Sequence, residues 1–231
     1  MTVVEGVPAR RNPLIRLTYA LARWELKRLT GKALMTPDIP IRAHRYGQLV
    51  GYAKFEKSVA RRPLVPERLR ALAVLKSAVM QGCEMCQDIG SFEARANGAS
   101  EEQLRDLPCY RDSEHFDETE RRVLDLAVAM TRTPVVVPPE LLEQLRAELG
   151  DAGVVELVHL IAVENLRSRF NGAFGLSATG FSEGMACARL EPEVGAGLGP
   201  APSSAAASGQ TPPGAGGQDG TGDGTGLAIA S

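Results

Sequence analysis

Two cysteines three residues apart are the side chains of this sequence whose type and spacing can do chemistry. Cys83 and Cys86 lie in the stretch SAVMQGCEMCQDIG, directly after Gly82. Residues three apart lie on one face of a helix, so the two sulfurs can approach bonding distance. If Gly82 ends one helix, both thiols lie in the first turn of the next, where free amides and the helix dipole stabilise a thiolate.

A reactive thiol with a partner three residues away can reduce a peroxide or exchange disulfides. One sulfur is oxidised to a sulfenic acid and the other condenses with it to form a disulfide. Two other interpretations stay open. A zinc ion needs four ligands, which the spacing C-x2-C-x22-C-x5-H supplies as Cys83, Cys86, Cys109 and His115, although its second half lacks the compact spacing of common zinc modules. In the third interpretation, both cysteines are small buried hydrophobic side chains.

Composition and charge narrow the class of protein. The chain has 231 residues, 44% of them hydrophobic, and a formal net charge of −2. This length is enough for one substantial core. The near-neutral charge gives no electrostatic reason to expect a nucleic-acid partner, and four cysteines are too few for a secreted disulfide scaffold.

The apolar segments of the chain are short or interrupted by charges. None approaches the roughly 20 residues that a membrane span needs. Arg16 and Arg23 interrupt the apolar stretch near the N-terminus, which a signal-peptide core would not tolerate. We therefore expect a cytoplasmic protein without a membrane partner, and in that compartment a CxxC pair is more often catalytic or metal-binding than a permanent crosslink.

The elements that must position the cysteines all carry helical signals, and no long stretch shows strand-like alternation. Pro66 suits a first helical turn, Gly82 suits a helix stop, and Asp117 with Glu120 forms a capping pair. Near the N-terminus, an apolar row with helical spacing consists of Leu14, Leu17, Leu21 and Trp24. Helices are expected over residues 13–30, 43–60, 66–81, 83–97, 99–106, 117–131, 139–149 and 152–171.

These signals predict an all-α chain in three parts. Residues 1–60 form an N-terminal helical extension, and residues 61–185 form the main helical domain. The basic first helix could touch a membrane surface or wrap a neighbouring subunit, but its apolar row favours packing. Residues 191–231 are rich in Gly, Pro, Ala and Ser and contain no aromatic residue. Such a segment buries too little apolar surface to offset its ordering entropy, so a disordered tail is expected.

Three segments together resemble a known family. The stretch LRALAVLKSAVMQGCEMCQDIG resembles the signature helix-turn-helix of the carboxymuconolactone decarboxylase and alkylhydroperoxidase D superfamily. ETERRVLDLAVAMTRTP and DAGVVELVHLIAVENLRSRFNGAFGL resemble the two helices that follow. The resemblance covers about residues 60–180 and implies an alkylhydroperoxidase D-like helical bundle that assembles as a homo-oligomer. In the peroxidase branch of the family the second cysteine, here Cys86, usually attacks the hydroperoxide, and the first, here Cys83, resolves the product.

The sequence departs from that family at two positions of its proton relay. The glutamate twelve residues before the first cysteine is Ala71 here, and the histidine four residues after the second is Gly90. Peroxide reduction needs a thiolate and a proton for the departing oxygen. Without the relay, only the two thiols carry over from the family, and the helix dipole by itself favours Cys83 as the attacking thiolate.

Three other residues are candidates to replace the missing relay. Asp88 follows Cys86 by two residues, but it can equally complement the helix dipole. Glu67 lies one turn before the Ala71 position and also suits an ordinary helix opening. His159 shares a helix face with Glu156, or is a satisfied core or subunit-contact histidine. Later on that helix a polar band is interpreted as structural ion pairing or an oligomer contact; it consists of Glu164, Asn165, Arg167 and Arg169.

The leading hypothesis is a cysteine-based peroxidase of the peroxiredoxin type, or a thiol-disulfide oxidoreductase, that uses Cys83 and Cys86. Its substrate would be a small-molecule hydroperoxide, its electrons would come from a dithiol protein, and it would need no metal or organic cofactor. One alternative is a decarboxylase- or isomerase-like enzyme acting on a small carboxylic acid. The other is a non-catalytic oligomeric scaffold of the same fold.

Overall fold

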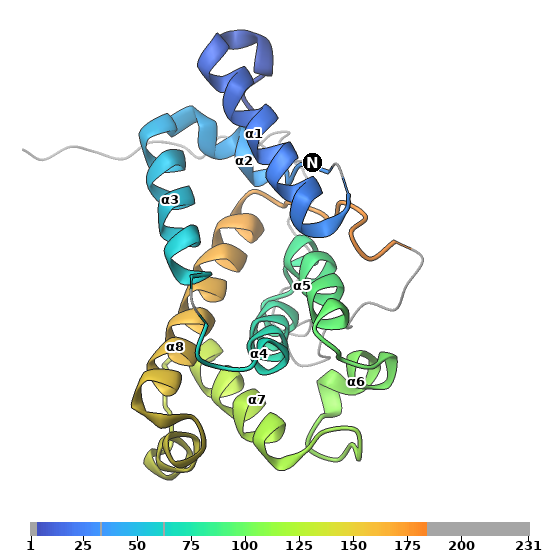
Figure 1. The fold of residues 1–231 in the computed structure, drawn as a ribbon, viewed down its shortest axis with the longest axis vertical. Helices are drawn as coiled ribbons and strands as arrows, with labels where there is room; N and C mark the ends of the chain where they lie inside the picture. Colours follow the sequence, from blue (N-terminus) through green and yellow to red (C-terminus); the bar gives the residue numbers. More distant parts are fainter. Residues whose placement is uncertain (1–3, 33, 62, 184–231) are drawn as a thin grey trace, which may run out of the picture. The chain divides into compact units, whose positions relative to one another are not determined.

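A computed structural model of the chain describes residues 4–32, 34–61 and 63–183. In these residues the regular elements are all helices, as the sequence predicts (Figure 1). They are, in chain order, η1 (Ala9–Arg11), α1 (Pro13–Thr30), α2 (Asp38–Arg42), η2 (Ala43–Arg45), α3 (Tyr46–Val59), α4 (Glu67–Met80), α5 (Glu84–Ala96), α6 (Glu101–Asp106), η3 (Leu107–Cys109), α7 (Glu118–Thr131) and α8 (Pro139–Ala173).

Helix α4 is the centre of the core because it packs against α5, α7 and α8 (Figure 1). A helix that is surrounded on several sides must be apolar around most of its circumference. Leu72, Leu75 and Val79 are fully buried, and most of α4 after Leu69 is shielded from solvent. Each such side chain contributes roughly 1.5–3 kcal/mol through removal from water. The core therefore fixes α4, and with it the turn that leads into α5.

Local signals set the helix boundaries where the sequence predicts them. Gly82 adopts a positive φ of 65°, which ends α4 and lets Cys83 become the N-cap of α5. Asp117 and Glu120 form a capping box in which each side chain accepts from the other's backbone N–H. Gly150, with φ 71° and ψ 170°, interrupts α8 where a helix end is expected. The chain thus enters α5 with both cysteines in its first turn.

The N-terminal helix α1 packs through a different face from the one that its apolar row predicts. Ile15 and Tyr19 are buried in a small cluster with Val7, Ala43 and Leu49. The Tyr19 hydroxyl donates to the Val7 carbonyl oxygen at 2.7 Å, which fixes this face inward. The predicted row is instead 52–61% exposed and consists of Leu14, Leu17, Leu21 and Trp24. The expectation that this row packs is therefore wrong within the chain.

Within the residues that the structure describes, none of the helices is both long and apolar enough to cross a bilayer. The tail predicted at residues 191–231 and the end of the domain predicted at 61–185 lie outside the described residues. The boundary predicted near residue 60 stays a prediction.

Candidate functional site

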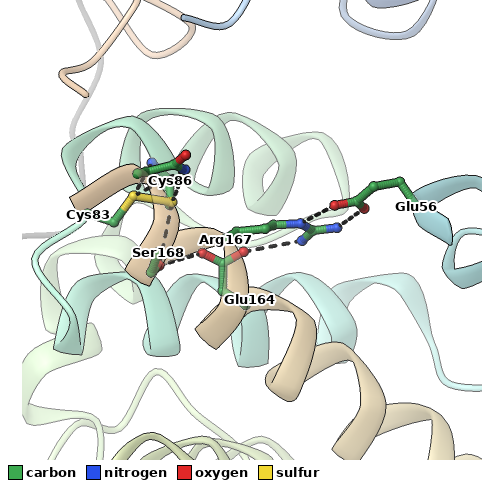
Figure 2. The surroundings of a disulfide bond; sticks show 7 residues. Glu56, Cys83, Cys86, Glu164, Arg167 and Ser168 are labelled. Atoms are coloured by element: carbon green, nitrogen blue, oxygen red, sulfur yellow. Dashed lines mark hydrogen bonds and ion pairs between the residues drawn. A yellow bond between two sulfur atoms is a disulfide. The ribbon is translucent and has the colours of Figure 1, made fainter. Parts of the chain in front are cut away.

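Cys83 and Cys86 are joined by a disulfide at the start of α5, with their Cα atoms 5.2 Å apart (Figure 2). The backbone N–H of Cys86 donates to Cys83 Sγ at 3.2 Å, so the first sulfur takes the place of a capping oxygen. Both residues are buried, with 3% and 8% of their surface exposed. The sulfur pair thus lies at the positive end of a helix dipole and is shielded from bulk water.

A row of polar side chains on α8 faces this disulfide. Glu164, Ser168 and Asn171 are four and three residues apart, which places them on one face of the helix, and all three are buried. Asn171 Nδ2 lies 3.3 Å from Cys86 Sγ and 3.8 Å from Cys83 Sγ. Ser168 Oγ lies 3.5 Å from Cys86 Sγ and 2.9 Å from Glu164 Oε1 (Figure 2). The row connects a buried carboxyl group to the sulfur of Cys86 through one hydroxyl.

The charge around Glu164 is set by burial and by Arg167. Burial raises the pKa of Glu164 to about 7, against the opposing effects of Arg167 and Ser168. Arg167 Nη1 lies 3.2 Å from Glu164 Oε2, and its guanidinium also binds both oxygens of Glu56 on α3 (Figure 2). Burial would raise the pKa of Glu56, but the hydrogen bonds from Arg167 lower it below its usual value. Glu56 therefore balances Arg167, and Glu164 can hold a proton near neutral pH.

The hydroxyl of Ser168 can carry a proton in either direction along this row. It has a single hydrogen and two acceptors within reach, Cys86 Sγ and Glu164 Oε1. When Glu164 is protonated, its carboxyl group donates to Ser168 and the hydroxyl hydrogen is available to the sulfur. When Glu164 is ionised, the hydroxyl donates to the carboxylate. The two arrangements provide a path for one proton between Glu164 and a reduced Cys86.

Asp88, a predicted relay candidate, anchors the segment after α8. It is 4% exposed, and its carboxylate accepts from the backbone N–H groups of Thr179, Gly180, Phe181 and Ser182 at 2.6–2.9 Å. Burial acts to raise the pKa of Asp88, but these four hydrogen bonds lower it below the usual value. Its acceptor sites are therefore occupied by the backbone, and the contacts favour a structural role over proton transfer.

Glu67 and His159 do not approach the disulfide through any contact that the structure shows. Glu67 begins α4, about 20 Å along the helix axis from its end at Met80, and pairs with Arg70 at the surface. His159 is exposed on α8 and makes an edge contact with Phe55, with ring centroids 5.6 Å apart.

The Glu156 carboxylate, predicted to work with His159, instead accepts from the backbone N–H of Leu64 at 2.7 Å and pairs with Arg70. The relay predicted from Glu67 or from His159 is therefore not supported by their positions, because helical spacing alone does not tell which face turns to the cysteines.

The alternative zinc site is not assembled. Cys83 and Cys86 are bonded to each other, whereas Cys109 is an exposed free thiol in η3. His115 lies 3.7 Å from Asp106 at the surface. Over residues 4–32, 34–61 and 63–183, three or more His, Cys, Asp or Glu side chains nowhere come together in a metal-binding group.

Helix packing explains why Gly90 suits the position where the family has a histidine. A Cβ atom on Gly90 would lie 3.1 Å from Leu75 Cδ1 and 3.6 Å from Leu75 Cα. The close approach of α4 and α5 therefore leaves no room for a larger side chain without a shift of Leu75. The polar groups next to the sulfurs come from α8 instead.

The sequence contained a signal for the α8 row that spacing from the cysteines does not reveal. The buried apolar residues Leu157 and Ile161 are continued at the same helical spacing by Glu164, Ser168 and Asn171. Polar residues that continue a buried face predict an internal polar site. Sequence reasoning identified Glu164 as part of an ion-pairing band, and the ion pair is present, but nothing linked that band to a sulfur 78 positions earlier in the chain.

Comparisons with known proteins agree with the predicted family and with this fold. The carboxymuconolactone decarboxylase family matches residues 50–131. The uncharacterized protein YnjA of Escherichia coli (strain K12) is 32% identical over 177 residues, which are 75% of this chain and 93% of YnjA.

Two solved structures share the fold at low sequence identity. The debrominase Bmp8 superimposes with a TM-score of 0.66 at 18% identity, over 78% of this chain and 94% of Bmp8. An uncharacterized peroxidase-related protein from Silicibacter sp. TM1040 superimposes with a TM-score of 0.65 at 18% identity, over 80% of this chain and 95% of that protein. The alkylhydroperoxidase D-like helical fold predicted from the sequence is thereby confirmed, and the chain belongs to the carboxymuconolactone decarboxylase family.

Proposed function

We propose that the protein is a cysteine-based peroxidase that reduces hydroperoxides with Cys86 and forms the Cys83–Cys86 disulfide as its oxidised state. The observation that carries this proposal is the hydrogen-bonded row from Glu164 through Ser168 to the sulfur of Cys86. A disulfide that serves only as a crosslink does not need a proton acceptor or donor near it. A thiol that loses a proton in each reaction cycle does need one, and Glu164, a buried acid with a pKa of about 7, can fill this role.

The first step is attack of reduced Cys86 on the hydroperoxide. The thiol proton passes through Ser168 to an ionised Glu164, and the thiolate attacks the outer oxygen of the peroxide. A sulfur–oxygen bond forms, the oxygen–oxygen bond breaks, and the departing alkoxide takes the proton back from Glu164 to leave as the alcohol. An acid with a pKa near the working pH is suited to both transfers.

The second step joins the two sulfurs. Cys83 attacks the sulfenic acid on Cys86, the disulfide forms, and the oxygen leaves as water. Asn171 Nδ2 approaches both sulfurs and can hold them in position during the exchange. A dithiol reductant then returns the pair to two thiols, completing a cycle that consumes one hydroperoxide and one dithiol.

The roles of the two cysteines follow from their surroundings. Cys86 contacts Ser168 of the polar row and is the more exposed of the two residues, whereas Cys83 accepts the N–H of Cys86 as the cap of α5. The helix dipole alone favours a Cys83 thiolate, but catalysis also requires a proton for the leaving oxygen. Cys86 is linked to the acid Glu164 through Ser168 and is the less buried of the two cysteines, so we assign it as the attacking thiol.

The proposal is tested by measuring the rate at which the reduced protein consumes cumene hydroperoxide in the presence of excess dithiol. We expect turnover to disappear in both Cys83→Ser and Cys86→Ser and to persist in the matched control Cys109→Ser. In a single-turnover measurement after the dithiol has been removed, Cys83→Ser should still consume one equivalent of peroxide and leave a sulfenic acid that dimedone traps, whereas Cys86→Ser should consume none. Ser168→Ala should slow the reaction by about 100-fold. Turnover in the wild type that does not exceed the dithiol background would reject the proposal.

The remaining expectations from the sequence are part of the same proposal. They are a dithiol protein as reductant, a homo-oligomer and a cytoplasmic location. The decarboxylase- or isomerase-like enzyme stays the alternative, and conversion of a carboxylic acid that survives loss of both Cys83 and Cys86 would favour it.

A further inference from the structure

A cavity of about 270 Å³ lies where the N-terminal helices meet the end of α8. Its volume is slightly below the range of roughly 300–1,000 Å³ that is usual for small-molecule sites. Its lining combines apolar and aromatic side chains with basic ones. Among them are Ile41, Arg42, His44, Arg45, Phe170 and Phe174.

The apolar wall of this cavity also covers the disulfide. Ile41 belongs to the same buried cluster as Cys83 and Cys86, and Phe170 and Phe174 pack against that cluster. An occupant of the cavity would therefore touch the side chains that shield the two sulfurs from solvent. Since Cys83 and Cys86 are only 3% and 8% exposed as residues, the side chains packed around them limit the access of a substrate to the sulfurs.

Arg42 gives the cavity a fixed positive charge. Its guanidinium lies between two aromatic rings, 3.9 Å from the centroid of Tyr52 and 3.6 Å from that of Phe170. Arg42 Nε pairs with Asp38 at 3.1 Å, and the side chain is only 10% exposed. Stacking holds the planar guanidinium in place, so little entropy is lost when it binds an anion.

The ionisable side chains that line the cavity are all basic. Arg45 and His44 lie beside Arg42, and His44 Nε2 is 2.8 Å from the carbonyl oxygen of Glu5, which fixes the ring. Asp and Glu are absent from the described residues that line the cavity. A cavity that is lined by aromatic and basic side chains, with no acidic side chain among its described lining residues, is complementary to an apolar molecule with a carboxylate.

We propose that this cavity selects the substrate of the cysteine pair, and that this substrate is an apolar organic hydroperoxide that carries a carboxylate. The carboxylate binds Arg42 and Arg45, and the hydrocarbon part lies against Phe170 and Phe174, next to the side chains that cover the disulfide. The choice of a hydroperoxide rests on the proposed function. The choice of an apolar anion rests on the cavity alone.

Two measurements test separately whether the cavity binds an apolar anion and whether the substrate of the cysteine pair is a hydroperoxide. The first is calorimetric binding of 4-isopropylbenzoate, which has no peroxide group, compared with the neutral 4-isopropylbenzyl alcohol. We expect the acid to bind more tightly, and its affinity to fall about tenfold in Arg42→Gln and in Arg45→Gln, because each removes one charged hydrogen-bond donor. Arg169→Gln is the matched control, since Arg169 is an exposed arginine of α8 that does not line the cavity.

The second measurement compares kcat/KM for cumene hydroperoxide and for its para-carboxylate derivative. We expect the carboxylated peroxide to be preferred by the wild type, and the ratio of the two kcat/KM values to fall about tenfold in Arg45→Gln but not in Arg169→Gln. Arg45 is exposed, so its replacement leaves the fold intact. Equal binding of acid and alcohol, or affinities unchanged in both arginine variants, would overturn the proposed cavity site. Tight binding of the acid without turnover of either peroxide would support the site and reject the peroxidase reaction instead.

Discussion

Replacement of Glu164 by Gln tests whether this acid holds a proton in the folded protein. The pKa of Glu164 is raised from 4.5 to about 7 by burial, so the folded chain binds a proton that the unfolded chain releases between these two values. The stability that Glu164 contributes is therefore fully present below about pH 4.5 and is lost as the pH rises through 7. At 1.36 kcal/mol per pKa unit the whole change is about 3 kcal/mol, and most of it falls between pH 5 and pH 8.

Glutamine has the shape of protonated glutamate but does not titrate. We therefore expect Glu164→Gln and the wild type to have similar free energies of unfolding at pH 5. At pH 8 the free energy of unfolding of the variant should be higher by roughly 2–3 kcal/mol. Urea titrations of the disulfide form at the two pH values measure this difference. The control is Glu143→Gln, at an exposed position of the same helix, which should show no such change.

A difference between Glu164→Gln and the wild type that is the same at pH 5 and pH 8 would refute the reasoning. It would mean that Arg167 keeps Glu164 ionised throughout, and that no proton is available to Ser168. The proposed proton path to Cys86 would then fail together with the prediction.

Two further predictions concern residues next to the site. Asp88→Asn should lower the free energy of unfolding by about 2–3 kcal/mol at pH 7, because a charged acceptor of four N–H groups is lost. Because the pKa of Asp88 is lowered, its contribution is complete above the ordinary value of about 3.8 and declines as the pH falls below it, so urea titrations at pH 7 and pH 3 should give a smaller difference at pH 3. Gly90→His should cost about 1–3 kcal/mol in thermal or urea unfolding, because its Cβ meets Leu75 at 3.1 Å. It should not accelerate peroxide reduction, and a faster reaction would show that the position still accepts the histidine of the family relay.

Much of the fold is determined locally and was therefore predictable. Gly82 supplies the positive φ between α4 and α5, Gly150 interrupts α8, and the capping box of Asp117 and Glu120 starts α7. Each of these signals acts within a few residues, so it can be read from the sequence without knowledge of the tertiary structure. The spacing of Cys83 and Cys86 likewise brought the two sulfurs within reach of each other, although a zinc site and two unpaired buried cysteines stayed open until the structure showed the disulfide.

The tertiary structure decided which face of each helix is buried and which residues far apart in the chain come into contact. The row that begins with Leu14 has the helical spacing of a buried stripe, yet Ile15 and Tyr19 are the residues of α1 that are buried. Amphipathic spacing defines a face but does not specify which neighbour covers it.

The same limit applies to the chemistry of the site. The sequence by itself determined the helical fold, the family and a cysteine pair at a helix start. Only the packing of α8 against α5 decided that Glu164 and Ser168, rather than Asp88 or His159, lie beside Cys86. The physical reason is that a buried proton path requires contacts between segments far apart in the chain, and these form only when the core is packed.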